Sequence, residues 1–365
     1  MILRILKIIV LTVVCAILLS IIGALCYRAY LQYRVSESRA IRPANGIDSL
    51  ERVRIGGIDQ WIEVRGDDVN NPILLFIHGG PGIAFIPLAG SFQGPWERHF
   101  TVVQWDQRGA GKTYASNGRK LQRRTMNVAQ MEQDTLDVVN YLRQRFHRQK
   151  IFVVGHSWGS VLGLWLAHEH PELLYAYVGT GQLIDTTEND ALAYRDALRL
   201  ARSTQNAQAV TELESIAPYP TTQADERKES VARRWEGKLL GPGPSVPQFT
   251  DTKRIMRDVF TAPEYSLGDD IGFMRGMALS LEMFLPQLTD IHLAQMGSEY
   301  RVPVFFFEGR DDPFCRPAAV LDFSRKITGA PAEFVWIEDA GHFPFFEQKQ
   351  EFTEELVNRV LPLAR

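Results

Sequence analysis

The residues of this chain that could perform chemistry are a serine, a histidine and two aspartates, each placed after a short apolar run. Ser157 lies in the sequence GHSWG, which follows the apolar run 151–154 and opens a helical pattern. This strand-turn-helix context is the one that a G-x-S-x-G nucleophile elbow requires. The two glycines are needed because a side chain at either position would collide with the neighbouring strand or helix. We therefore expect the Ser157 hydroxyl to be exposed above a sheet.

A serine hydroxyl becomes a good nucleophile when a histidine takes its proton and a carboxylate holds that histidine in the right tautomer. Asp311 and Asp312 follow one apolar run, and His342 follows the last predicted strand, 333–337. Ligands bind at the carboxyl ends of the strands in open α/β sheets. The chain order Ser157, Asp312, His342 places each member of a triad after its own strand. Position alone leaves Asp311 as an alternative acid.

The developing oxyanion needs two hydrogen-bond donors. The sequence HGGPG, residues 78–82, directly follows the apolar run 73–77, and its glycines let backbone N–H groups approach a substrate closely. The elbow supplies the second donor through the residue after the nucleophile, Trp158. We predict an oxyanion hole made by this loop and the Trp158 N–H.

Other polar groups receive structural interpretations. His168 and His170 are two positions apart on a predicted helix and point to different faces, so we predict no metal site, and no cofactor is implied. Asp106 and Arg108 are predicted to brace the oxyanion loop as an ion pair. The basic run 119–124 is typical of a solvated face, which in a tethered protein could also touch anionic lipid headgroups.

The elements that position these residues alternate between strand and helix. Segments 50–55 and 58–64 flank Gly56-Gly57 and indicate a β-hairpin. Short continuous apolar runs then indicate strands that are covered on both faces. These runs are 73–77, 100–105, 151–154, 173–178 and 302–307. Helical patterns at 126–146 and 160–168 lie between them, so we predict an α/β fold with a mostly parallel sheet and helices on both faces.

The alternation stops between residues 183 and 296. This stretch is rich in charge and helix formers and contains no convincing buried strand, so we predict an inserted helical cap. The resulting division is a basic leader (1–7), a membrane helix (8–27), a linker (28–46), a core (47–182 and 297–365) and the cap (183–296).

The segment 8–27 contains 20 residues without a charge. As a helix it would span about 30 Å, the thickness of a bilayer's hydrocarbon core. We predict a single-pass N-terminal anchor rather than a cleaved signal peptide, whose apolar region is usually about 7 to 15 residues and ends at a small-x-small site. Basic residues flank both ends of the segment, so the side of the membrane that holds the body stays open.

Composition places the body among globular proteins. The chain has 365 residues, of which 45% are hydrophobic and 23% charged, and its net charge is −3. The first 42 residues carry a net charge of +5 and the remaining 323 carry −8. An acidic body argues against nucleic acid as a partner. Cys15 and Cys26 lie in the apolar segment and Cys315 is alone in the body, so no disulfide within the body is expected.

Five motifs together resemble the proline iminopeptidases (prolyl aminopeptidases) of the α/β-hydrolase fold. They are HGGPG (78–82), WDQRGAGKT (105–113), GHSWGS (155–160), GRDD (309–312) and AGH (340–342), spread over roughly residues 50 to 360. The resemblance implies that Ser157, Asp312 and His342 form the triad, because the GRxD motif of the family places its acid at Asp312. It also implies that Gly79 and Trp158 supply the oxyanion hole and that the insertion covers the site.

The same resemblance concerns the substrate. The family recognises a free N-terminal amine with cap glutamates, one of them in a Trp-Glu pair. Glu236 follows Trp235 and matches that pair, and Glu282 lies where a second glutamate is expected. An ammonium group in a closed pocket needs carboxylate partners. Gly80 of the HGGPG loop is assigned to the substrate-binding residues as well. The sequence departs from the family after Glu282 and in its N-terminal apolar segment.

These observations predict a membrane-anchored serine hydrolase of the proline iminopeptidase type. It would release N-terminal residues, with proline preferred, from small peptides through an acyl-enzyme. The alternative within enzymes is an esterase or amidase that acts on small acyl substrates, since fold and triad do not fix the acyl group. A tethered, non-catalytic binding protein is the alternative outside enzymes, and the intact triad argues against it.

Overall fold

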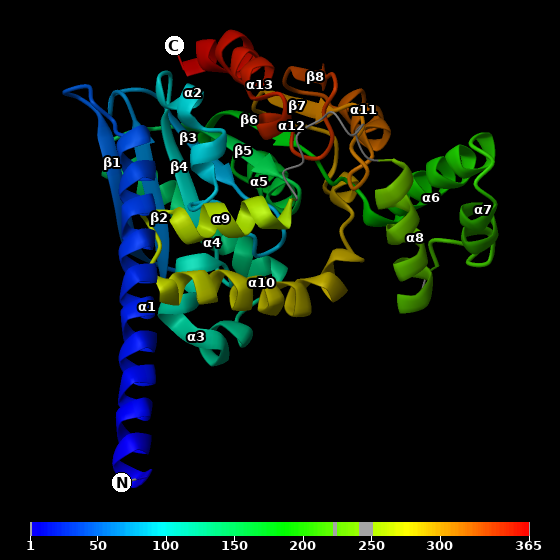
Figure 1. Ribbon diagram of the computed structural model, residues 1–365. Helices are drawn as coiled ribbons and strands as arrows, with labels where there is room; N and C mark the ends of the chain where they lie inside the picture. Colours follow the sequence, from blue (N-terminus) through cyan, green and yellow to red (C-terminus); the bar gives the residue numbers. More distant parts are fainter. Residues whose placement is uncertain (1, 222–224, 241–250, 365) are drawn as a thin grey trace.

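The structure, a computed structural model, describes residues 2–221, 225–240 and 251–364. Within these residues an eight-stranded sheet forms the centre, in the order β1-β2-β4-β3-β5-β6-β7-β8 (Figure 1). β2 is antiparallel to both of its neighbours, and the pairings from β4 to β8 are parallel. The strands are β1 (Ile47–Ile55), β2 (Ile58–Gly66), β3 (Ile73–Ile77), β4 (Thr101–Asp106), β5 (Ile151–His156), β6 (Leu174–Thr180), β7 (Val304–Gly309) and β8 (Ala332–Ile337). The predicted mostly parallel sheet is confirmed.

The central strands are apolar along their whole length because both faces of the sheet are covered. In β3, Leu75 packs on one face, while Leu74 and Phe76 pack on the other. One face is covered by α4 and α5, and the other by α2, α12 and α13. Alternate residues of one continuous apolar run therefore belong to two different cores.

The helices lie on both sides of this sheet and in the insertion after β6 (Figure 1). In the core they are α2 (Gly94–Glu97), α3 (Gly111–Arg123), α4 (Val128–Arg145), α5 (Trp158–Glu169), α11 (Pro317–Ser324), α12 (Pro344–Glu347) and α13 (Lys349–Glu355). In the insertion they are α6 (Thr186–Ser203), α7 (Ala207–Glu214), α8 (Glu226–Leu239), α9 (Thr252–Thr261) and α10 (Leu267–Leu288).

The insertion has two separate parts among its described residues. α6, α7 and α8 pack around a small apolar core of their own that includes Leu213, Ile216 and Trp235. α9 and α10 lie on the other side of the molecule, where α10 runs alongside α3 and α9 approaches the first helix of the chain (Figure 1). The sequence predicts the helical insertion but not its division.

The first helix, α1 (Ile2–Ser38), corrects the predicted linker 28–46. Residues 28–38 continue the apolar helix without a break because they contain neither proline nor glycine and because their polar side chains bind the body. An 18-residue stretch of α1 has a mean hydropathy of 3.0 and is not buried in the body. A membrane anchor has this length and composition, and a signal sequence near the N-terminus can pass the same test.

Candidate active site

Ser157 lies in the turn between β5 and α5, with the backbone angles φ 52° and ψ −120°. A positive φ is strained for a residue other than glycine, and it is typical of a nucleophile elbow. A Cβ atom at Gly159 would lie 2.0 Å from the carbonyl oxygen of Ile77, and one at Gly155 would lie 2.7 Å from the carbonyl oxygen of Gly159. The predicted steric need for both glycines is thus confirmed.

His342 and Asp312 form a pair at the same edge of the sheet. The His342 Nδ1 lies 2.7 Å from Asp312 Oδ2, and the Asp312 carboxylate is fully buried. Its other oxygen accepts the backbone N–H groups of Phe314 and Cys315 at 2.7 and 2.9 Å. Asp311, the alternative acid, is exposed. A carboxylate in this position favours the tautomer of His342 that carries its proton on Nδ1, and Nε2 is then the nitrogen that the predicted mechanism uses as a base.

Two residues that the sequence analysis did not identify hold the histidine loop. His156 Nε2 lies 2.9 Å from the carbonyl oxygen of His342, and the two rings are 4.8 Å apart. Burial keeps the pKa of His156 well below its usual value, so the neutral ring donates its Nε2–H to that carbonyl. Glu347 accepts the N–H of Gly341 at 2.6 Å. His156 lies inside the elbow motif itself, which is the signal that could have found it.

The described contacts include no hydrogen bond between Ser157 Oγ and His342. The two residues share His156 as a neighbour, since His156 precedes the serine and binds the histidine backbone. Catalytic hydrogen bonds are often long before substrate binds and tighten in the complex. The transfer of the Ser157 proton to His342 therefore stays a prediction.

The loop 78–82 lies against the nucleophile. A Cβ atom at Gly79 would be 2.9 Å from the Cβ of Ser157, so only glycine fits there. The buried ring of His78 accepts the Gln107 N–H at Nε2 over 3.3 Å and donates Nδ1–H to the Gly79 carbonyl over 2.9 Å. Burial lowers the pKa of His78 to about 4, which keeps this ring neutral.

The two predicted oxyanion donors are held by one side chain. Gln107 donates from Nε2 to the His78 carbonyl at 2.8 Å and accepts from the Trp158 indole at 3.2 Å. Trp158 is the first residue of α5, where a backbone N–H has no partner within the helix. Gly80, the predicted substrate contact, follows Gly79 with φ 121° and is half-buried.

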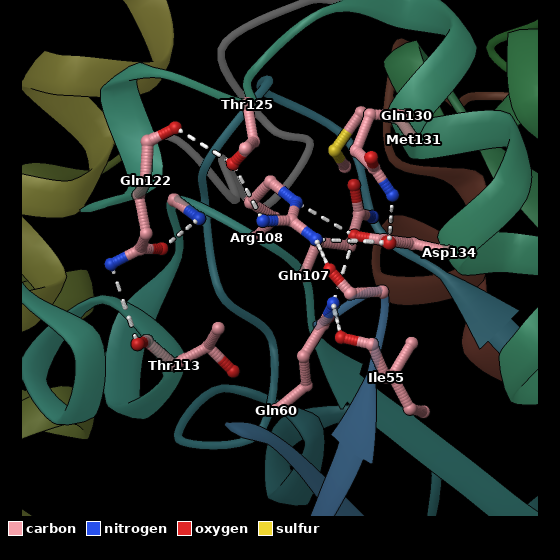
Figure 2. A network of polar contacts seen from close by, with 12 residues as sticks. Ile55, Gln60, Gln107, Arg108, Thr113, Gln122, Thr125, Gln130, Met131 and Asp134 are labelled. Atoms are coloured by element: carbon pink, nitrogen blue, oxygen red, sulfur yellow. Dashed lines mark hydrogen bonds and ion pairs between the residues drawn. The ribbon is translucent and has the colours of Figure 1, made fainter. Parts of the chain in front are cut away.

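The predicted ion pair between Asp106 and Arg108 is wrong. Arg108 pairs with Asp134 of α4, with both groups fully buried and the Arg108 Nε 2.9 Å from Asp134 Oδ2 (Figure 2). Asp106 instead accepts the Lys112 N–H and the Tyr265 hydroxyl. Arg108 also donates to the Gly56 carbonyl at 2.8 Å. This network connects α4 and the β1–β2 turn to the end of β4. It stabilises the fold and takes no part in the predicted reaction.

Glu236 is buried in the cap with one oxygen unused. Its Oε2 lies 3.3 Å from Arg233 Nη1, while Oε1 has no hydrogen-bond partner among the described residues. Arg233 also pairs with Asp190 of α6 at 2.7 Å. Burial raises the pKa of the Glu236 carboxyl to about 7, against the lowering effect of Arg233.

Hydrogen bonds join this cap cluster to the turn after β7 that holds Asp312, which we call the acid turn. Asn189, next to Asp190, donates to the Phe314 carbonyl at 2.9 Å and accepts the Arg316 N–H at 2.7 Å. The Arg316 guanidinium donates to the Asp312 carbonyl at 2.7 Å. Glu236 therefore belongs to a polar cluster beside the pair formed by Asp312 and His342. No motif in the sequence marked Asn189, Asp190 or Arg316.

The structure does not bring Glu282 to this cluster. Its carboxylate is 41% exposed and pairs with Arg119 and Arg123 of α3 at 2.6 and 3.1 Å. The side chain lies on a surface between α10 and α3, and its charge is already matched by the two arginines. Glu282 therefore lies outside the cluster that contains Glu236, and its expected role in substrate binding is not supported.

One group of side chains has the composition of a metal site. Donor atoms of Asp312, Cys315 and His342 lie within 4.8 Å of one another, and all three residues are buried. The carboxylate is already used by His342 and by two backbone N–H groups. These bonds match a catalytic pair, and a metal ion would compete with them.

The fold and this edge of the sheet define the class of the protein. The sequence profile of the alpha/beta hydrolase fold family matches residues 72–349, and the chain belongs to this family. The predicted α/β-hydrolase fold is thus confirmed.

Named relatives narrow the class. The chain is 26% identical over 311 residues to the probable aminopeptidase YbaC of Bacillus subtilis, covering 84% of this chain and 94% of that protein. It is 25% identical over 294 residues to the proline iminopeptidase of Arabidopsis thaliana, covering 77% and 71%. The crystal structure of proline iminopeptidase from Mycobacterium smegmatis has the same fold, with a TM-score of 0.62, 17% identity and coverage of 86% and 98%. The predicted resemblance is confirmed: the chain is a hydrolase similar to aminopeptidases and proline iminopeptidases.

Proposed function

We propose that this protein is a membrane-anchored serine aminopeptidase of the proline iminopeptidase type, which releases N-terminal residues, proline preferred, from small peptides. The observation that carries the proposal is the unpartnered, buried carboxylate oxygen of Glu236 beside the acid turn of the triad. Leaving a buried polar atom without a partner costs about 1 to 3 kcal/mol, so the position of this oxygen in the cap supports a ligand that donates a hydrogen bond to it. A substrate ammonium group supplies the missing donor.

The proposed chemistry gives each residue of the triad one role. His342 Nε2 takes the proton of Ser157 as Oγ attacks the scissile carbonyl carbon, and the oxyanion is held by the N–H groups of Gly79 and Trp158. The amide bond breaks when His342 gives that proton to the leaving amine. Water, deprotonated by the same histidine, then hydrolyses the ester on Ser157 and frees the N-terminal residue.

The cluster of Glu236, Asp190 and Arg233, which we call the amine subsite, sets how many residues are released from the N-terminus. Within the part of the cap that the structure describes, Arg233 is the one cation that pairs with both Glu236 and Asp190, so the cluster has room for one more positive charge. Its connection to the acid turn through Asn189 and Arg316 keeps the subsite next to the scissile bond. An enzyme built this way removes residues from a free N-terminus and rejects blocked peptides.

A set of matched substrates tests this proposal. The expected order of kcat/KM is prolyl arylamide above alanyl arylamide, with N-acetylprolyl arylamide far below both. Short acyl esters that turn over while free-amine arylamides do not would favour the esterase or amidase alternative and refute the aminopeptidase. Absence of turnover on every substrate would favour a non-catalytic binding protein.

The anchor is supported by α1, whose segment 8–27 has no charge and is not buried in the body. Extraction of membranes with alkaline carbonate tests it, because an inserted helix stays in the pellet whereas a cleaved leader leaves the body in the supernatant. Protease protection in sealed vesicles then reports the side of the membrane that holds the body.

A further inference from the structure

An apolar groove opens where α1 meets α9 and α10. Its volume is about 770 Å³, and the surface exposed in it is almost entirely apolar, although Arg257, Asp270 and Arg275 are among its lining residues. It is lined by Tyr27 and Leu31 of α1, Val259 and Phe260 of α9, and Ile271 and Met274 of α10. Phe260, Ile271 and Met274 are between 40% and 54% exposed, which is unusual for large apolar side chains gathered in one place.

The groove lies at the end of the uncharged segment of α1. Arg28 donates from Nε to the Phe260 carbonyl at 2.9 Å and pairs with Asp270 at 3.0 Å. Gln32, one turn later, donates to the carbonyls of Ala262 and Tyr265 at 2.7 and 2.9 Å. These bonds fix α1 to the α9–α10 connection. A helix rises about 1.5 Å per residue, so the groove lies within about two turns of Tyr27, the last residue of the uncharged segment 8–27.

The same side of the body carries both apolar and basic residues. The N-terminal part of α1 projects beyond the body on the side of α3 and α10 (Figure 1). Leu121 of α3 and Leu267 and Leu285 of α10 are 44% to 54% exposed. Lys120 of α3 and Arg275 of α10 are exposed and make no ion pair among the described residues. Apolar residues interspersed with unpaired cations are typical of a surface that lies in a lipid interface.

We propose that this groove binds an acyl chain of an anionic phospholipid, with the lipid phosphate at Arg275. Arg275 lines the groove and also a neighbouring hollow of about 820 Å³ between α3 and α10, so its guanidinium lies beside both. The occupant is a lipid because the groove continues the apolar surface of α1 and its free charge is positive. The inference rests on the proposed membrane anchor.

Photo-crosslinking of the full-length protein in liposomes tests the proposal. The crosslinker p-benzoylphenylalanine replaces Met274 in the groove, Leu18 in the proposed membrane span, or Leu363, an exposed leucine near the C-terminus. The liposomes contain phosphatidylcholine with or without phosphatidylglycerol, and intact-protein mass identifies each adduct. We expect phospholipid adducts at positions 274 and 18 and none at 363.

The three positions separate failure of the groove from failure of the anchor. Adducts at 18 without adducts at 274 would refute the groove and keep the anchor. Absence of adducts at both positions would refute the anchor and the groove with it. A protein–protein adduct at 274 would show that a second copy or another chain fills the groove, and would also overturn the proposal.

A charge substitution tests the place of the phosphate. With the crosslinker at position 274, Arg275→Ala should lower the adduct yield in phosphatidylglycerol liposomes about fivefold, the effect of one basic residue near an anionic surface. Arg275→Lys should largely restore it. Arg227→Ala, at an exposed arginine of α8, is the matched control and should change nothing. An equal loss in Arg275→Ala and Arg227→Ala would refute a specific phosphate site.

Discussion

Replacement of Glu236 by glutamine should change the pH dependence of stability. Burial raises the pKa of the Glu236 carboxyl from 4.5 in the unfolded chain to about 7 in the folded protein. Between these two pH values the folded protein keeps a proton that the unfolded chain has lost. The stability that this proton contributes is fully present below pH 4.5 and is lost as the pH rises through 7. Between pH 5 and pH 8 the wild type should therefore lose about 2 to 3 kcal/mol that Glu236→Gln keeps.

Urea unfolding of both proteins at pH 5 and pH 8 measures this difference. The other titrating groups are shared by the two proteins, so subtracting the two free energies of unfolding isolates residue 236. Glu282→Gln, at an exposed glutamate, is the control and should follow the wild type. Parallel pH profiles of wild type and Glu236→Gln would refute the raised pKa.

The same substitution should lower kcat/KM for substrates with a free amine and leave N-blocked substrates unaffected. Truncating one partner of a buried charge pair costs about 2 to 5 kcal/mol, so Glu236→Gln should lower kcat/KM for prolyl arylamide by about 30-fold or more. N-blocked esters make no such contact and should keep their rates. Equal losses on both substrates would mean that Glu236 holds the cap together and does not bind the amine.

Three further substitutions, one of them with a control, test the supports of the fold and of the site. Asp134→Ala leaves the Arg108 guanidinium buried and unpaired, so it should lower the free energy of unfolding by about 3 to 5 kcal/mol, whereas Glu338→Ala, at an exposed ion pair, should cost under about 1 kcal/mol in the same urea titration. Gly159→Ala places a Cβ 2.0 Å from a β3 carbonyl and should abolish turnover, and an active protein would refute the close packing of the elbow. Glu347→Gln should lower kcat with little change in KM, because this carboxylate holds the backbone of the histidine loop; a change in KM alone would contradict that role.

The strands, the glycines of the elbow and the pairing of Asp312 with His342 could be predicted because each follows from a simple rule of chain geometry. A strand covered on both faces must be apolar at every position, so the run 73–77 predicts β3 by itself. The elbow depends on two glycines that sit within two residues of Ser157. The carboxyl ends of parallel strands meet at one edge, which brings Asp312 and His342 together although they are 30 residues apart.

The features of the fold and the site that the sequence did not predict depend on contacts between distant segments. Arg108 finds its partner in Asp134, a residue of an amphipathic helix that no motif distinguishes from its neighbours. The helix α1 is fixed to the body by Arg28, which binds carbonyls more than 200 residues away. Glu282 matches the expected position of a family glutamate but is drawn to α3 by arginines. Sequence spacing carries no signal for such pairings.

Trapping of the acyl-enzyme tests the central proposal most directly. Proline p-nitrophenyl ester has a good leaving group, so acylation should outpace hydrolysis and the covalent intermediate should accumulate. After rapid acid quenching and proteolysis, mass spectrometry should find one prolyl group on the peptide that contains Ser157, and Ser157→Ala should neither carry this group nor release p-nitrophenol above the uncatalysed rate. Turnover by Ser157→Ala at the wild-type rate, or a prolyl group on another residue, would contradict the assignment of Ser157 as the nucleophile.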